Sequence, residues 1–441
     1  MKTRRSWLVF IWICLVLPGL AGCDAFLAQF RSQSERFRLE GDRLLTEDRK
    51  AEAILSYRAA LENDPANLAA AKSLADLYAG QNRRRLAQQV LEAAIARAPQ
   101  ESGLSQALAA LGAPLPASGP LKLRWQARPG QAEPVGFTLE NQRLYVSLAD
   151  GSVICLEAGS GQVCWQKMLP ARATSAPAVG AGRLWLGAQN GILYGLSLEN
   201  GETVWKFATK APVYVPPALS GDTVYLASGD SSLYAVNLSD ASLKWSFATR
   251  GPLHARPTLA DGVLYFGSND AHLYALEASS GVPFWKDGVL TQGAVESQAV
   301  VDAGRVYIGS GDSRLYCLAT ASGGEYWRIS TPDAVYAPVV VAGDTLYAAS
   351  AGNSLYAIQK ITGKKQWEVR ARSAITAPPV SFGSALVYVA ASDPHLYAVN
   401  PTSGAPLYQV DTGDWLAAGP QQFNGLLYLL GKDGTILALS E

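Results

Sequence analysis

The sequence has few of the residues that build most metal and acid–base sites. Its 441 residues include two methionines and three histidines, His254, His272 and His395. So few histidines indicate neither a cluster that could bind a metal nor a general base for a serine nucleophile. A phosphate-binding glycine loop and a Cys-x-x-Cys pair are also missing. We therefore expect no catalytic residue and no metal, and we predict that the protein is not an enzyme.

The chain also lacks an excess of charge of either sign. It has 37 basic and 37 acidic residues, and hydrophobic residues make up 49% against 17% charged. This balance excludes an electrostatic nucleic-acid binder and a disordered chain, so we expect no nucleic-acid partner. The 41 glycines, 24 prolines, 19 tyrosines and 11 tryptophans favour a turn-rich β protein.

The N-terminus reads as a bacterial lipoprotein signal peptide over residues 1–23. Lys2, Arg4 and Arg5 precede an apolar run at 7–17, which is too short to cross a bilayer comfortably. The following Leu20-Ala21-Gly22-Cys23 resembles the lipobox, which implies cleavage before Cys23 and acylation of its thiol. The alternative is an uncleaved anchor. Either way we expect an extracytoplasmic protein anchored in a membrane, and the choice between inner and outer membrane stays open.

Residues 24–112 show a helical pattern with a period of 34, marked by Pro65 and Pro99. Small and aromatic residues recur in register: Gly41, Ala53, Tyr57 and Ala60 correspond to Ala75, Ala87, Leu91 and Ala94. These positions resemble the tetratricopeptide repeat, in which small residues let paired helices approach closely. The region could be a docking groove or a spacer, and a Pro-, Ala- and Ser-rich linker at 113–120 follows it.

From residue 121 onward, two aromatic columns repeat about every 40 residues. One column is Trp125, Trp165, Trp205, Trp245, Trp285, Trp327, Trp367 and Tyr408. The other is Tyr145, Trp185, Tyr225, Tyr265, Tyr307, Tyr347, Tyr388 and Tyr428. Four short strands per repeat are typical of a propeller blade. We predict a mainly β protein, an eight-bladed β-propeller over 121–441 preceded by a small α-helical tetratricopeptide-like region. The strand around Trp125 should complete the last blade, because the final unit stops before its own outer strand.

The individual units resemble the pyrroloquinoline-quinone-like (PQQ-like) propeller repeat. The segment Leu276-Glu277-Ala278-Ser279-Ser280-Gly281 before Trp285 carries this likeness. Quinoprotein dehydrogenases and the BamB family of outer-membrane assembly lipoproteins share the repeat, and a lipobox followed by eight plain blades is similar to the second. The resemblance implies a membrane-anchored scaffold that binds envelope proteins, barrel-assembly components among them. The helical repeats depart from that family.

The enzymatic alternative is a quinone-dependent dehydrogenase. Those enzymes hold their cofactor with adjacent cysteines and long blade insertions, whereas Cys155, Cys164 and Cys317 are not adjacent and no insertion exceeds two residues. We therefore expect no cofactor. Cys155 and Cys164 flank a hairpin turn, where two buried free thiols are favoured over a disulfide. A binder or sensor of cell-wall polymers is a third alternative.

In seven of the eight repeats, an acidic or amide residue recurs in the turn before the Leu-Tyr strand. The positions are Asp150, Asn190, Asp230, Asp270, Asp312, Asp393 and Asp433. Each blade supplies only one such residue, so we interpret them as turn formers and not as calcium ligands.

A partner-binding surface is predicted where each innermost strand begins. Eleven residues before the second aromatic column lie Thr174, Tyr214, His254, Glu296, Tyr336, Ala377 and Ala417, and two residues further lie Ala176, Pro216, Arg256, Gln298, Pro338, Pro379 and Gly419. This register surrounds one mouth of the central channel. Polar and aromatic side chains gather in four consecutive blades, which makes Tyr214, His254, Arg256, Glu296, Gln298 and Tyr336 the candidate partner-binding residues, here called the mouth sector. The alternative is an ordinary hydrated mouth.

Overall fold

The computed structural model describes residues 23–111 and 120–441. The predicted signal peptide lies outside these residues except for Cys23, which begins helix α2 and whose side chain is not among those described. Nearly all of the predicted linker also lies outside them. The chain forms two compact units that divide after Pro114. Within the described residues, no helix combines the length and the apolar character needed to cross a membrane.

The first unit is helical, and small residues let its helices pack closely. Its helices are α2 (Cys23–Thr46), α3 (Lys50–Asn63), α4 (Leu68–Gly80), α5 (Arg84–Arg97) and α6 (Ser102–Ala110). Ala53, Ala60 and Ala87 are fully buried in one core. A Cβ on Gly41 would lie 2.7 Å from the Tyr57 ring, so helix α2 can approach α3 only with glycine there. The Tyr57 hydroxyl donates to Asp42. This packing fits the predicted tetratricopeptide-like region.

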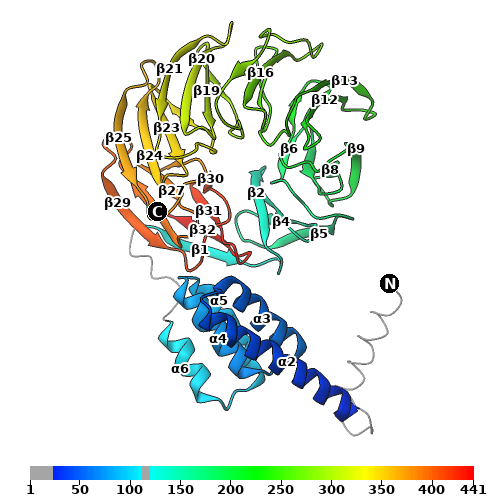
Figure 1. The fold of residues 1–441 in the computed structure, drawn as a ribbon, viewed down its shortest axis with the longest axis vertical. Coiled ribbons are helices and arrows are strands. Elements are labelled where there is room, and N and C mark those ends of the chain that lie inside the picture. Colours follow the sequence, from blue (N-terminus) through cyan, green and yellow to red (C-terminus); the bar gives the residue numbers. More distant parts are fainter. Residues whose placement is uncertain (1–22, 112–119) are drawn as a thin grey trace. The chain divides into compact units, whose positions relative to one another are not determined.

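The second unit consists of eight four-stranded antiparallel sheets arranged in a ring (Figure 1). The first four sheets in chain order are β2–β5 (Pro134–Glu140, Arg143–Leu148, Ser152–Glu157, Val163–Met168), β6–β9 (Ala178–Gly180, Arg183–Gly187, Ile192–Ser197, Thr203–Ala208), β10–β13 (Ala218–Ser220, Thr223–Ala227, Ser232–Asn237, Leu243–Ala248) and β14–β17 (Thr258–Ala260, Val263–Gly267, His272–Glu277, Val289–Leu290). The next three are β18–β21 (Val300–Asp302, Arg305–Ser310, Arg314–Ala319, Glu325–Ser330), β22–β25 (Val340–Ala342, Thr345–Ser350, Ser354–Gln359, Lys365–Arg370) and β26–β29 (Val380–Phe382, Ala385–Val389, His395–Val399, Pro406–Asp411). The predicted eight-bladed propeller is therefore confirmed.

The last sheet joins the two ends of this unit. It has the order β1-β32-β31-β30, with β1 (Lys122–Ala127), β30 (Gln421–Phe423), β31 (Leu426–Leu430) and β32 (Ile436–Ser440). Strand β1 pairs antiparallel with β32, from Lys122 opposite Ser440 to Ala127 opposite Ile436. The pairing covers edges that an open array would expose and closes the ring.

The tryptophan column connects seven of the eight sheets to the next one. Each indole Nε1 donates to a backbone carbonyl in the following sheet, at 2.9–3.4 Å, in the pairs Trp125–Ala158, Trp165–Leu198, Trp205–Asn237, Trp245–Ala278, Trp285–Thr320, Trp327–Lys360 and Trp367–Pro401. The second column adds donors to some of the same carbonyls: the hydroxyls of Tyr225 and Tyr307 also reach the Ala278 and Lys360 oxygens. The repeated aromatics thus have a structural use between blades.

The seventh repeat corrects one prediction. Val387 pairs with Val380 and Ala398, just as Tyr347 pairs with Val340 and Ala357. Val387 therefore occupies the second column, and Tyr388 faces the opposite side of the sheet because adjacent strand residues alternate. Consequently the mouth positions of this blade are Thr376 and Pro378, one residue before the predicted Ala377 and Pro379.

Candidate functional site at the mouth of the propeller

The mouth-sector residues lie in the connections that enter the innermost strands. Strands β10, β14, β18 and β22 are each first in their sheets, and β2, β6 and β30 are drawn nearest the centre of the ring (Figure 1). Tyr214, His254, Glu296 and Tyr336 each stand four residues before such a strand. The repeat therefore brings equivalent positions of neighbouring blades to one side of the ring.

Three of the predicted residues form a connected cluster across neighbouring blades. The rings of Tyr214 and His254 meet edge to face with centroids 4.7 Å apart. His254 Nδ1 lies 3.5 Å from Glu296 Oε1. Tyr214 remains 42% exposed, so the cluster presents an aromatic edge to solvent. Aromatic side chains held in this way are suited to contact a protein partner.

Asn269 completes this cluster, and sequence reasoning missed it. Its Nδ2 donates to Glu296 Oε1 at 3.1 Å and lies 3.4 Å from His254 Nδ1. The signal was present in the repeat: Asn269 stands in a Ser-x-Asp turn where the two neighbouring blades have Gly229 and Gly311. The turn forms with glycine at this position in the neighbouring blades, so the Asn269 side chain is not needed for the turn and can serve another contact.

Arg256 differs from its neighbours because no described residue pairs with it. Its side chain is half-buried, and burial lowers the pKa of its guanidinium. An unpaired, partly desolvated cation is costly, and an acidic group of a partner would relieve that cost. By contrast, Gln298 donates to Thr258 Oγ1 at 3.2 Å and so helps to join two blades.

Tyr336 is not brought into contact with the rest of the mouth sector. It is 41% exposed, and among the described residues no hydrogen bond or ring contact links it to the other five. Within the mouth sector, Tyr214, His254 and Glu296 are therefore connected, whereas Tyr336 stands apart from them.

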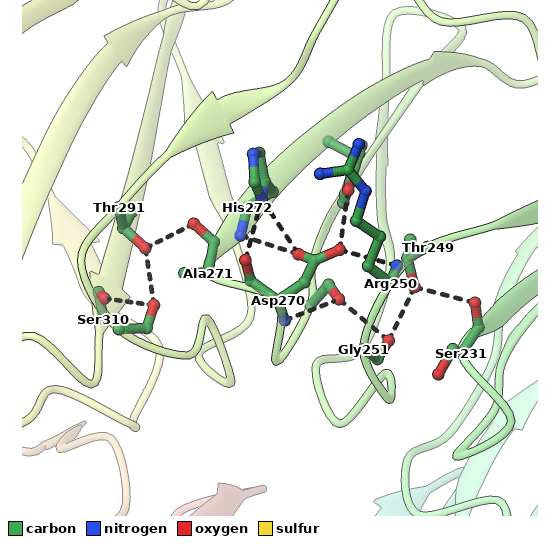
Figure 2. A network of polar contacts seen from close by, with 12 residues as sticks. Ser231, Thr249, Arg250, Gly251, Asp270, Ala271, His272, Thr291 and Ser310 are labelled. Atoms are coloured by element: carbon green, nitrogen blue, oxygen red, sulfur yellow. Dashed lines mark hydrogen bonds and ion pairs between the residues drawn. The ribbon is translucent and has the colours of Figure 1, made fainter.

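The recurring turn aspartates form hydrogen bonds within the propeller, as Figure 2 shows for Asp270. Its carboxylate accepts the backbone N–H groups of Arg250 and His272 and the Tyr274 hydroxyl. Burial alone would raise the pKa of Asp270, but these hydrogen bonds outweigh it and the pKa is lowered. Asp230, Asp312 and Asp393 likewise accept the hydroxyl of the tyrosine four residues on. Within residues 23–111 and 120–441, no group of three acidic, histidine or cysteine side chains could hold a metal ion.

The three described cysteines outside α2 are free thiols. Cys155 and Cys317 are buried, but Cys164 is exposed, so the prediction of two buried thiols at the hairpin is wrong for Cys164. Trp165 of strand β5 pairs with Cys155, and its neighbour Cys164 lies at the adjacent bulge with an exposed side chain. Burial, followed by the charge of Cys164, raises the pKa of Cys155 to about 12.

Eight four-stranded sheets, tied by tryptophans and closed by β1 and β32, define a PQQ-like propeller. The family model described as outer membrane protein assembly factor BamB matches residues 116–215, 189–300 and 284–385, which together span more than half of the chain. The chain belongs to this family.

Solved structures with the same fold include proteins of different activity. The chain is similar to BamB from Moraxella catarrhalis, with a TM-score of 0.63 and 19% identity over 73% of this chain and 98% of that one. It is similar to the computationally designed Ika8 protein (0.65, 15%, 73% and 100%). It is also similar to the quinohemoprotein alcohol dehydrogenase from Comamonas testosteroni (0.62, 13%, 72% and 76%). At these identities the likeness shows the fold alone. None of the curated proteins matches this sequence.

Proposed function

We propose that the protein is an extracytoplasmic scaffold, anchored by a lipid on Cys23, that binds protein partners during outer-membrane β-barrel assembly. Membership of the BamB family is the observation that carries this proposal. The lipobox before Cys23 supports the location. We further propose that the protein has no catalytic activity of its own.

The mouth sector is the surface we assign to a partner. Tyr214 and Tyr336 provide exposed aromatic area, and Arg256 provides a cation that no described residue neutralises. Aromatic residues and arginine contribute strongly to the binding energy of protein interfaces. A partner with an acidic residue near an apolar one would pair with Arg256 and pack against the tyrosines.

The quinone-dependent dehydrogenase is the weaker alternative. The chain shares its fold with the alcohol dehydrogenase at 13% identity. However, the spacing of Cys155, Cys164 and Cys317 cannot supply adjacent cysteines, and the aromatic columns serve contacts between blades. No feature of the described residues favours the enzyme.

The test combines Tyr214→Ala, Arg256→Ala and Tyr336→Ala in the full-length lipoprotein. We expect the variant to fold and to lose co-purification with barrel-assembly proteins, because all three side chains lie outside the blade cores. A matched control replaces the exposed outer-strand residues Val163, Val204 and Lys206 by alanine and should retain its partners. Equal recovery of the same partners by both variants would show that the mouth sector does not bind them.

A further inference from the structure

A cleft lies between two neighbouring blades of the propeller. The cavity of about 600 Å³ lies between the sheets β22–β25 and β26–β29. Tyr388 and Tyr397 form part of its wall, and their rings stack with centroids 5.3 Å apart. Its volume is in the range of sites that bind small molecules and single side chains of a partner.

Val369 lines the cleft at a position where two other blades have a phenylalanine. Two residues after the column tryptophan, the blades β6–β9 and β10–β13 carry Phe207 and Phe247. The Phe247 ring packs on Tyr274 of the next sheet with centroids 5.5 Å apart, and Phe207 packs similarly on Tyr234 at 5.6 Å. Valine lacks the ring, so the equivalent space beside Tyr397 is open.

The border of the cleft carries more positive than negative charge. Arg370 and Arg372 line it, and the Arg370 side chain is 79% exposed. Glu368 of the same strand accepts hydrogen bonds from Ser354 and Lys365, and its Oε1 also lies 3.6 Å from Arg370 Nε, so the border carries two arginines against one carboxylate that is already paired. The excess charge favours an occupant that bears a carboxylate.

The cleft also lies beside two sheet edges. Strands β25 and β29 are the outermost strands of their sheets. Residues 368–372, in β25 and directly after it, and residues 406–409 of β29 line the cleft. Such an edge can pair with an extended chain, whose alternate side chains then enter a neighbouring pocket.

We propose that this cleft binds an extended peptide segment of a partner protein, with an aromatic side chain against Val369 and Tyr397 and a neighbouring carboxylate paired with Arg370 or Arg372. The aromatic ring occupies the space that Phe247 fills between the other blades. This proposal rests on the cleft alone and is independent of the role in barrel assembly.

The probe is a fluorescein-labelled pentapeptide with a central phenylalanine, an aspartate on each side and threonine at both ends. Fluorescence anisotropy with the full chain should show saturable binding that weakens at least about tenfold when lysines replace the aspartates or alanine replaces the phenylalanine. Val369→Phe should abolish binding and maintain or raise the melting temperature, since the chain uses phenylalanine at this position elsewhere. The matched control is Ile329→Phe, the same position one blade earlier, which should bind as the wild type does.

Undiminished binding by Val369→Phe, or no saturable binding by the wild type, would overturn the proposal. If Val369→Phe lowers the melting temperature, the variant with both Arg370→Ala and Arg372→Ala decides instead, because both side chains are exposed. It should weaken the aspartate peptide at least about fivefold and leave the lysine peptide unchanged. Equal weakening of both peptides would contradict the charge pairing.

Discussion

Ala241 packs against the cluster that contains the Trp205 indole, at a turn position where glycine contacts the tryptophan in six other blades. Its φ of 60° lies in the left-handed region, as do those of the equivalent Gly161, Gly201, Gly281, Gly323, Gly363 and Gly404. The bond from Trp205 Nε1 to the Asn237 carbonyl is 3.4 Å, against 2.9–3.2 Å in the other blades. Alanine therefore stands in place of glycine at the contact between blades that has the longest indole hydrogen bond.

Ala241→Gly should stabilise the propeller. The substitution removes the left-handed strain of alanine, worth about 1 kcal/mol, and lets the Trp205 indole settle closer to its carbonyl. Thermal unfolding of the full chain should show a rise in melting temperature. The reverse change, Gly201→Ala, places a Cβ 2.6 Å from the Trp165 ring and should lower it. A fall in both variants would contradict this explanation.

Replacing Asp270 should destabilise the protein and reduce the dependence of its folding stability on pH in the acid range. Asp270→Ala leaves two backbone N–H groups and the Tyr274 hydroxyl without their acceptor, at a cost of about 1–3 kcal/mol. Asp270→Asn should cost less, because Asn190 serves in the equivalent turn and bonds to Tyr194.

The pH dependence follows from the lowered pKa of Asp270. A carboxylate whose pKa is lower in the folded state stabilises the fold above its unfolded pKa, near 3.8, and loses that contribution as pH falls through the folded value. The wild type should therefore lose stability below about pH 4 more steeply than Asp270→Asn. Parallel melting curves for the two proteins over this acid range would contradict the assignment.

Alkylation should distinguish the two hairpin cysteines. Cys164 is exposed, whereas Cys155 is buried and its pKa is raised to about 12. Because the thiolate is the reactive form, iodoacetamide at about pH 8 should label Cys164 and leave Cys155 unmodified until the protein unfolds. Peptide mass spectrometry gives both yields. A disulfide between the two residues in the native protein would show instead that they are oxidised.

Arg256→Ala should separate partner binding from stability. Since no described residue pairs with the half-buried guanidinium, its removal should change the melting temperature little or raise it. Recovery of partners should fall in the same variant. A marked loss of stability would mean that Arg256 supports the fold.

The regular repeat explains how much of this fold the sequence could predict. Equally spaced aromatic residues indicate blades of equal length, and this pattern is sufficient to predict the number of sheets. The spacing gave the wrong residue at Tyr388. The extra residue of this blade lies after Tyr388, in the turn between β27 and β28, so the column position is Val387. A shift of one residue exchanges the two faces of a strand. Asn269 was missed because turn residues were interpreted by their backbone role. The cleft could not be predicted, because residues of two neighbouring sheets line it and the repeat pattern does not specify how their side chains fill the space between the sheets.

The most direct test of the scaffold role is purification of the lipidated protein from gently solubilised native membranes. Mass spectrometry identifies the proteins that remain bound, and an absorbance scan of the same eluate detects a quinone. If the protein is this scaffold, the eluate should contain barrel-assembly components and show no quinone absorbance. A stoichiometric quinone chromophore without those components would contradict it and indicate a dehydrogenase.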